Sequence, residues 1–356
     1  MNCCINCFKD EQIRAVIKSK KTKGNCDFCN HQKTYIYDLD AYQELTDMFT
    51  SLLDIYSPKK YLPKDFPTKY LNLLKDELYH TWLIFSIDED KVNLLIKAIC
   101  KEMYDSNQDL FNDLVGIQEF ADESYIEENS LLNGCEWKDF VKSIKSENRF
   151  HTDHINEDIL GDFFSYASIS YKKNDKFYRS RICENEKGFN KKDMGCPPPD
   201  KALGGRANPT GISYLYLSDS VYTTIYEIRA SIYDYVAVSE FYVAKENLKV
   251  VDFTKLTKIS PFAIDNILRL AINIKNLEDI SSSISKPLRR YDSPLDYLAT
   301  QYISDFIKSK KYSGIQYYST INKDGFNLAI FNEHDFTRKK PKVYEVKGIE
   351  YLYEKI

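Results

Sequence analysis

Apolar residues recur at helical spacing through the first half of the chain and at strand spacing through the second half. Between residues 40 and 160, apolar side chains follow every third or fourth position, which predicts amphipathic helices at 41–56, 91–104 and 137–144. From about residue 165, short runs rich in Tyr, Ile and Val predict strands. We predict strands at 177–182, 214–217, 235–242, 248–253, 315–319, 327–331 and 342–346, with helices at 221–229, 261–275 and 295–308.

This change of pattern predicts an α+β protein in three parts. Residues 1–38 form a cysteine-rich segment, residues 39–164 a helical domain, and residues 165–356 a mixed α+β domain. A chain of 356 residues is long enough to bury more than one core. We find no internal repeat.

The cysteine-rich segment contains two C-x-x-C pairs, Cys4 with Cys7 and Cys26 with Cys29. Four thiolates at this spacing can surround a zinc ion as a tetrahedron, which leaves no open position and predicts a structural site. Cys3 is an alternative to Cys4, and His31 is a weaker substitute. The competing interpretation is a set of unligated thiols in a reducing compartment.

Charge and hydropathy limit the partners and the compartment. The net charge of −4 and the pI near 5.9 argue against broad nucleic-acid binding, which favours a basic surface. No apolar run approaches the roughly 20 residues of a membrane-spanning helix, and the N-terminus lacks the apolar core of a secretory signal. We therefore predict a cytoplasmic protein with no membrane partner.

The segment from Gly204 to Glu227 carries the strongest chemical signal. Gly205 allows a close approach of backbone to ligand, and Arg206 offers a planar guanidinium suited to phosphate oxygens. Tyr216 lies on a predicted strand and Glu227 on the helix that follows. A cation, an aromatic face and a carboxylate on consecutive elements suit a nucleotide whose reaction develops positive charge. Alternatively, Glu227 is a carboxylate in the N-terminal half of its helix, favoured there by the helix dipole.

Two further segments offer polar candidates. Arg179 and Arg181 share one face of a predicted strand, so that one or both could enter a cleft. An exposed arginine on an edge strand is the alternative. Ser319 ends a predicted strand and could hydrogen-bond a ligand amide, although it is also a typical turn residue.

A competing enzyme site is the R-x4-H pattern of Arg149 and His154. This spacing is found in helical HEPN-type ribonucleases, in which Arg and His on adjacent helical turns cleave an RNA phosphodiester. The match is short, and His151 makes the pattern ambiguous. Chance or structural use is the stronger interpretation.

Taken together, the second half of the chain resembles the RES domain, a toxin family named for its Arg, Glu and Ser. The resemblance runs from about Phe177 to Phe331. It rests on Tyr178-Arg179, Gly204-Gly205-Arg206, Asn208-Pro209, Tyr216 to Asp219, Glu227, Thr300-Gln301, Gly314 to Ser319, and Asn327. One departure is Ala207, where the family often carries Trp. The region before this RES-like span contains the C-x-x-C pairs and a helical segment ending in Arg149-Phe150. It resembles the HEPN-like N-terminal extension of some RES proteins.

The resemblance implies a fold similar to the ADP-ribosyltransferase toxins and an enzyme that splits the nicotinamide–ribose bond of NAD. Arg179 and Arg206 would then bind phosphates, Tyr216 would pack on the nicotinamide riboside, and Glu227 would stabilise the developing cation. Ser319 would help to seat the nicotinamide. Gly205, Asn208 and Asn327 would contribute to NAD binding.

The setting implied is a toxin–antitoxin pair or antiphage defence. Candidate partners are NAD, inorganic phosphate, a cognate antitoxin or immunity protein, and a second copy of the chain. Transfer of ADP-ribose to a macromolecule, ribonuclease activity and nucleotide-dependent regulation remain the alternatives. The sequence leaves open whether water or phosphate attacks the ribose.

Overall fold

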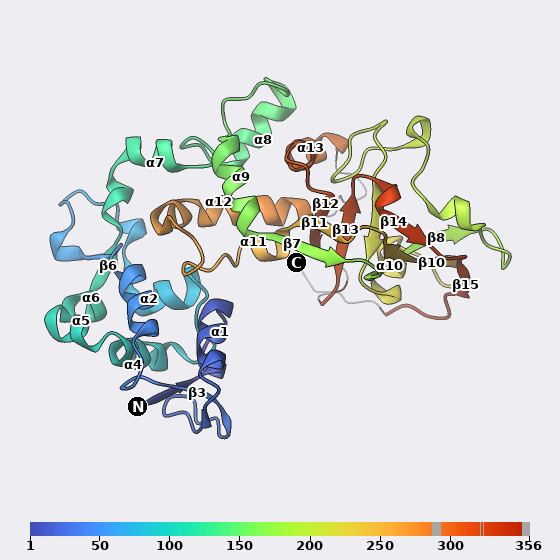
Figure 1. The fold of residues 1–356 in the computed structure, drawn as a ribbon. Helices are drawn as coiled ribbons and strands as arrows, with labels where there is room; N and C mark the ends of the chain where they lie inside the picture. Colours follow the sequence, from blue (N-terminus) through green and yellow to red (C-terminus); the bar gives the residue numbers. More distant parts are fainter. Residues whose placement is uncertain (287–292, 321, 323, 351–356) are drawn as a thin grey trace. The chain divides into compact units, whose positions relative to one another are not determined.

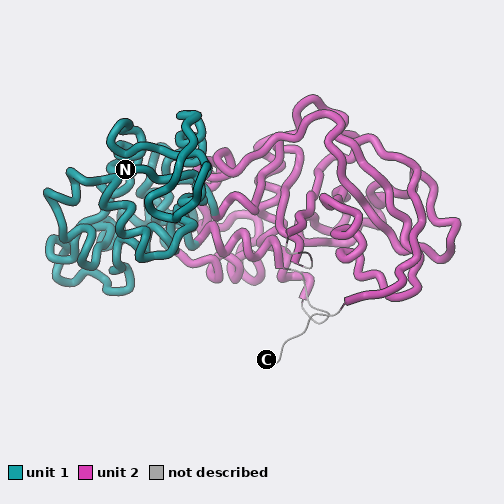
Figure 2. Tube along the Cα trace, turned by 90° about the horizontal axis from the view of Figure 1, so that it is seen from below, with its two compact units in different colours: residues 1–134, 258–275 teal, residues 135–257, 276–356 magenta. Residues whose placement is uncertain are grey.

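The computed structural model describes residues 1–286, 293–320, 322 and 324–350 (Figure 1). It confirms a mixed α+β fold. Contacts within the chain define two compact units (Figure 2): unit 1 comprises residues 1–134 with 258–275, and unit 2 comprises residues 135–257 with 276–356. The predicted boundaries at residues 38 and 164 remain a prediction.

Unit 1 is helical with two small antiparallel sheets, of strand order β1-β3-β2 and β4-β6-β5. Its core contains the rings of Phe8, Phe49 and Phe85 in mutual contact. Its strands are β1 (Asn2–Cys4), β2 (Lys23–Gly24), β3 (Thr34–Asp38), β4 (Ser57–Pro58), β5 (Asn72–Leu73) and β6 (Leu114–Gly116). Its helices include α1 (Glu11–Ser19), α2 (Glu44–Leu53), α3 (Leu74–Asp76), α4 (Glu89–Ile99), α5 (Lys101–Ser106), α6 (Gln108–Asn112) and α7 (Glu123–Asn129).

Unit 2 is built around one mixed sheet. Its described strands pair in the order β14-β10-β8-β9-β13-β12-β11-β7, and β15 pairs with β10. Among these pairs β11 and β12 are parallel, and the others are antiparallel. The strands are β7 (Ser168–Lys172), β8 (Lys176–Cys183), β9 (Leu215–Ser218), β10 (Tyr235–Val243), β11 (Asn247–Asp252), β12 (Gly314–Tyr318), β13 (Phe326–Ile330), β14 (Phe336–Arg338) and β15 (Lys342–Glu345). All seven predicted strands are present.

The helices of unit 2 are α8 (Trp137–Ser146), α9 (Glu157–Tyr166), α10 (Val221–Glu227), α11 (Phe253–Leu256), α13 (Leu298–Ser309) and the later part of α12 (Ile267–Ser285). Alternation along β9 buries Leu215 and Leu217 in the core and turns Tyr216 to the other face. No helix in the described part of the chain is long and apolar enough to cross a membrane.

Helix α10 is fixed to the sheet by buried hydroxyl groups. The backbone nitrogen of Ser180 on β8 donates to Thr224 Oγ1 (3.0 Å), and Ser180 Oγ donates to the Thr224 carbonyl (2.6 Å). Ser220 caps the helix by accepting from the Thr223 nitrogen (3.1 Å), as a serine at this position commonly does. Because buried polar groups are costly to leave unpaired, these contacts fix the position of Glu227, the last residue of α10.

Candidate functional site

A pocket of about 380 Å³ in unit 2 brings most of the predicted site residues together. Its walls come from β8, β9, β12, β13 and α10 and from the glycine–arginine loop before β9. The predicted residues that line it are Arg179, Gly205, Arg206, Tyr216, Glu227 and Asn327; Ser180, Leu217, Ser218, Thr224, Ile228, Tyr297 and Tyr317 complete the lining. Residues drawn from the long stretch between Arg179 and Asn327 thus face one cavity.

The carboxylate of Glu227 is held by two donors on the same oxygen. Ser319 Oγ donates to Oε1 (2.6 Å), and Asn327 Nδ2 donates to Oε1 (2.8 Å). Ser218 Oγ in turn donates to Asn327 Oδ1 (2.7 Å), which orients the amide. These donors fix the direction of the carboxylate. Ser319 contacts the Glu227 carboxylate but is not part of the pocket lining.

One prediction for Glu227 is wrong. It lies at the C-terminal end of α10, not in its N-terminal half. The helix dipole places partial negative charge at that end, so it disfavours a carboxylate there. The hydroxyl and the amide from β12–β13 and its turn provide the stabilisation that the helix cannot.

Arg206 faces the same pocket as Glu227. Its guanidinium lies 4.9 Å from the ring centroid of Tyr317, and its Nη1 donates to the Ser285 carbonyl (3.1 Å). Burial acts to lower the pKa of Arg206, whereas Tyr317 when ionised at high pH and the Glu227 carboxylate act to raise it, and the pKa is raised overall. Burial raises the pKa of Tyr317 to about 12, so this ring stays neutral. The charges of Arg206 and Glu227 therefore act on each other across one cavity.

The glycine–arginine loop is fixed by α13 and by Asn208. Gln301 Nε2 donates to the Gly205 carbonyl (2.8 Å), and Thr300 Oγ1 donates to the Arg206 carbonyl (2.6 Å). Asn208 is buried; its Nδ2 donates to three loop carbonyls, and its Oδ1 accepts from the Tyr216 hydroxyl (2.6 Å). Asn208, predicted to contribute to NAD binding, thus lies outside the pocket lining and holds the loop and Tyr216 in place.

Gly205 is the position where a side chain would collide with this arrangement. A Cβ atom there would lie 2.8 Å from Asn208 Oδ1 and 2.9 Å from the Tyr216 hydroxyl. We expect Gly205→Ala to break the Tyr216–Asn208 hydrogen bond and to lower the free energy of unfolding by about 1–3 kcal/mol, as overpacking does. Denaturant unfolding of the variant and of the wild type measures this loss of free energy. Gly348→Ala, where a Cβ meets no atom within 4 Å, is the control; equal losses in both variants would contradict the argument.

Arg179 is the second cation of the pocket. Its Nη1 donates to the Tyr216 carbonyl (3.0 Å), while its buried Nε has no hydrogen-bond partner among the described residues. Burial lowers the pKa of Arg179, although an arginine stays charged in proteins. Arg181, its neighbour on the strand, is exposed and stacks on Phe189 at 4.4 Å. Of the two arginines, Arg179 is therefore the one that enters the cavity.

Sequence reasoning did not single out Tyr297 and Tyr317, which both line the pocket. The signal for Tyr317 was available. Tyr317 lies two positions after the buried Ile315 on β12, so both side chains lie on the same face of the sheet. Tyr297 ends the 3-10 helix η8 (Pro294–Tyr297), and no periodic pattern marks it. Its place in the pocket depends on the packing of distant segments.

The Arg149–His154 pattern lacks the predicted geometry. Both residues lie in the loop between α8 and α9, not on adjacent helical turns. Arg149 Nε donates to the Ile144 carbonyl (3.4 Å), and His154 Nδ1 contacts the Thr152 hydroxyl at 3.2 Å. The competing interpretation needs a helical Arg–His pair, which is not present because the chain leaves the helical path after Ser146; structural use of these residues was the stronger interpretation.

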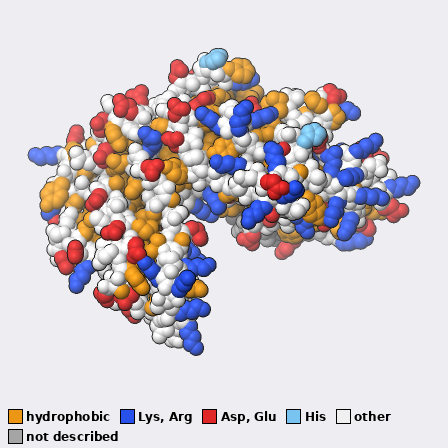
Figure 3. Space-filling view, in the orientation of Figure 1, with side chains coloured by type: hydrophobic (Ala, Val, Ile, Leu, Met, Phe, Trp, Pro, Cys, Tyr) orange, Lys and Arg blue, Asp and Glu red, His pale blue; other side chains and the backbone are white. Residues whose placement is uncertain are grey.

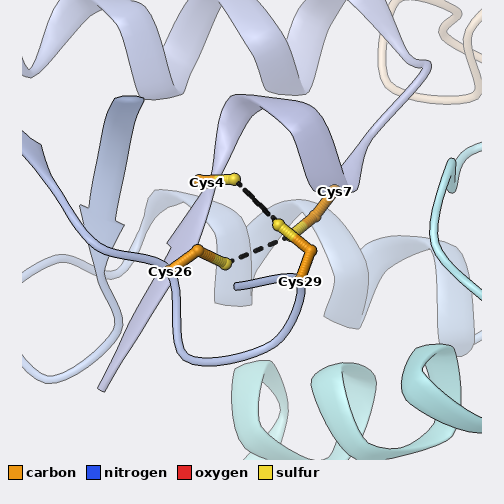
Figure 4. A group of neighbouring side chains, drawn as sticks. All are labelled: Cys4, Cys7, Cys26 and Cys29. Atoms are coloured by element: carbon orange, nitrogen blue, oxygen red, sulfur yellow. Dashed lines mark hydrogen bonds between the residues drawn. The ribbon is translucent and has the colours of Figure 1, made fainter. Parts of the chain in front are cut away.

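The four predicted cysteines of unit 1 form a cluster (Figure 4). Their sulfur atoms all lie within 4.8 Å of one another. The Cys4–Cys7, Cys4–Cys29 and Cys7–Cys26 sulfur distances are 3.8, 3.3 and 3.5 Å. Zinc bound by four thiolates at about 2.3 Å requires sulfur atoms roughly 3.8 Å apart, so this donor set fits a tetrahedral metal ion. Cys3 is buried but lies outside the cluster.

Comparison with known proteins identifies the second half of the chain. Residues 177–352 match the family model described as the RES domain. The chain therefore carries a RES domain over this span, as its resemblance predicted. A solved structure of the M. tuberculosis MbcT–MbcA toxin–antitoxin complex is similar at 14% sequence identity, with a TM-score of 0.33, over 53% of this chain and 93% of the other. No curated protein matches the chain.

Proposed function

We propose that this protein is an NAD-degrading toxin or effector that cleaves the nicotinamide–ribose bond. The observation that carries the proposal is the shared pocket of Arg206 and Glu227, in which Ser319 and Asn327 fix the carboxylate. Membership in the RES family supports NAD as the substrate. The setting we propose is a toxin–antitoxin pair or antiphage defence, with a cognate antitoxin and a cytoplasmic site of action.

The chemistry of the reaction matches the charges of the pocket. Cleavage of an N-glycosidic bond to a cationic leaving group passes through an oxocarbenium-like state, as in glycoside hydrolysis. A carboxylate fixed before the reaction stabilises that positive charge without reorganisation. Glu227, held on one oxygen by two donors, is the group we assign to this role.

The two arginines provide the complementary anion site. Arg206 is oriented by Tyr317 and Ser285, and Arg179 keeps an unpartnered buried Nε within the described part of the chain. Buried donors of this kind are normally satisfied, and guanidinium groups bind phosphate oxygens strongly. We assign Arg179 and Arg206 to the phosphates of NAD or to an attacking inorganic phosphate, and Tyr216 to the nicotinamide riboside.

Chromatography of NAD breakdown products, with and without inorganic phosphate, tests the proposal. We expect the wild-type protein to release nicotinamide. Free ADP-ribose would identify water as the nucleophile, and ADP-ribose with a phosphate on its anomeric carbon would identify phosphate. Arg206→Ala removes a charge-assisted contact of about 1.5–3 kcal/mol, so we expect cleavage to slow by about 10–100-fold. The absence of nicotinamide release would contradict the proposal.

The closest rival reaction uses the same pocket to transfer ADP-ribose onto a macromolecule. NAD labelled in its adenosine half separates the two reactions. Simple degradation leaves the label in small molecules, whereas transfer places it on protein or nucleic acid. We expect no label above background on protein or nucleic acid in a cell extract incubated with the wild-type protein, and retained label would favour the rival.

We further propose that Cys4, Cys7, Cys26 and Cys29 hold a structural zinc ion. The sulfur distances suit tetrahedral coordination, and three of the four side chains are buried. Four thiolate ligands leave no open position for water. The ion would therefore stabilise the fold of unit 1 and take no part in NAD cleavage.

A further inference from the structure

A second pocket of unit 2 adjoins the pocket of Arg206 and Glu227. Its volume is about 390 Å³. Tyr297 lines both pockets. Thr300, which lines the second pocket, donates its hydroxyl to the Arg206 carbonyl at 2.6 Å. The two cavities therefore share Tyr297 as a wall residue, and Thr300 connects the second one to the loop that carries Arg206.

The second pocket combines residues from inside and outside the RES domain. Lys286 and Asp296 belong to the matched span, residues 177–352. Trp137, Lys138 and Lys145 come from α8, which precedes that span. Helix α8 thus gives this chain a cavity wall that the RES domain alone does not provide.

Helix α8 is held against the RES domain by specific contacts. The indole Nε1 of Trp137 donates to Ser283 Oγ on α12 at 2.7 Å. The ring of Phe140 meets Tyr302 on α13 edge to face, with centroids 5.5 Å apart. These contacts fix the wall of the pocket in position.

The charged groups that line the second pocket are mainly cationic. The lining contains three lysines and one carboxylate, that of Asp296, which pairs with Lys145. Lys138 pairs with Glu136 at its exposed end (2.7 Å), and Lys286 is exposed. Figure 3 shows Lys and Arg side chains gathered near α8 and α13. Ammonium groups beside an indole and a phenol suit a ligand with phosphate and an aromatic base.

The size of the first pocket also favours a ligand that extends into a second cavity. Pockets for small molecules range over about 300–1,000 Å³, and the pocket of Arg206 and Glu227 lies near the lower end of that range at about 380 Å³. A dinucleotide consists of two nucleoside halves joined by a pyrophosphate. A neighbouring cavity of similar volume would provide space for the half that the first pocket does not hold.

We propose that the second pocket binds the adenosine phosphate half of NAD, while the first pocket holds the nicotinamide riboside. This inference rests on the proposed function, since it assigns the two halves of the same substrate. The pyrophosphate would then pass Tyr297 next to Arg206. Helix α8, outside the RES domain, becomes part of the substrate site and favours dinucleotides over mononucleotides.

Binding measurements on the full chain test the inference. The variant is Lys138→Glu with Lys286→Glu, and the probes are NAD, AMP and nicotinamide mononucleotide, titrated by calorimetry. We expect the affinity for NAD and AMP to fall by at least about 10-fold, the effect of losing one charge-assisted contact. Affinity for nicotinamide mononucleotide stays at the wild-type value. Lys138→Arg with Lys286→Arg keeps the charge and is expected to keep the affinity.

The matched control is Lys310→Glu with Lys311→Glu, which makes the same charge change in a different pocket of unit 2. Equal NAD affinity in the Lys138–Lys286 variant and this control would overturn the inference, while nicotinamide release by the wild type would still support the proposed function. NAD binding that depends on Lys138 and Lys286 without any nicotinamide release would support the pocket and contradict the reaction. No NAD binding by the wild type would overturn both.

Discussion

Replacing Glu227 with glutamine is expected to reduce kcat for NAD cleavage by about 10²–10³-fold, the usual effect of removing one electrostatic stabiliser from an active site. Glutamine keeps the size of the side chain and a carbonyl oxygen that can accept from Ser319 and Asn327. The variant therefore loses the negative charge and little else. We expect KM and the free energy of unfolding to change much less than kcat. Steady-state kinetics measures kcat and KM, and denaturant unfolding measures the free energy of unfolding.

A suitable control for this variant is Glu246→Gln. Glu246 lies on the surface of unit 2, where it pairs with Lys173 at 2.7 Å, and its side chain is 82% exposed. Surface pairs of this kind contribute little, so the control should keep the wild-type kcat. If Glu227→Gln kept the wild-type kcat while folded, Glu227 would not be the group that stabilises the cation.

The second large effect is expected from the cysteine cluster. Structural zinc sites in small domains contribute about 10–16 kcal/mol of binding free energy to folding, which is as large as the whole stability of a typical domain, about 5–15 kcal/mol. We expect Cys4→Ala with Cys26→Ala to abolish zinc binding and to unfold the N-terminal part of unit 1. Elemental analysis of the purified chain should find one zinc per wild-type molecule and none in the variant.

Cys3→Ala is the matched control for the cluster. Cys3 is as deeply buried as Cys4 and lies next to it, but it is not one of the four clustered cysteines. This control should keep its zinc and most of its stability. A wild-type protein purified under reducing conditions without bound metal would contradict the zinc proposal, whatever the stability of the variants.

The strands of unit 2 were predictable from local pattern, and the ends of the longest helix were not. The runs at 235–242 and 327–331 differ from β10 and β13 by one residue at most at each end, because buried strands need continuous apolar residues. The helix expected at 261–275 instead occupies Ile267–Ser285. Asn266 accepts from the Arg269 nitrogen at its start (2.9 Å). In the serine-rich end of this helix, Ser281 donates its hydroxyl to the Phe253 carbonyl (2.9 Å), a contact with a distant segment that no local pattern predicts.

The edge strands of the sheet were missed for a related reason. β7 and β14 are short, and they pair with β11 and β10, which lie far away in the sequence. Their sequences, Ser-Ile-Ser-Tyr-Lys and Phe-Thr-Arg, lack the apolar run that marks β9 or β13. Their conformation is set by the partners that supply the hydrogen bonds.

The sequence by itself determined which chemical groups are available: the C-x-x-C pairs, the glycine–arginine loop, Tyr216 and Glu227. These signals are local, because each depends on the spacing or the residue type of one short segment. Only the tertiary structure decided how the groups are used. It placed Ser319 and Asn327 on one oxygen of Glu227, left Cys3 out of the cluster, and brought α8 to a pocket beside the RES site. Such contacts join residues far apart in the chain, and their geometry follows from the packing of whole elements, which no local pattern encodes.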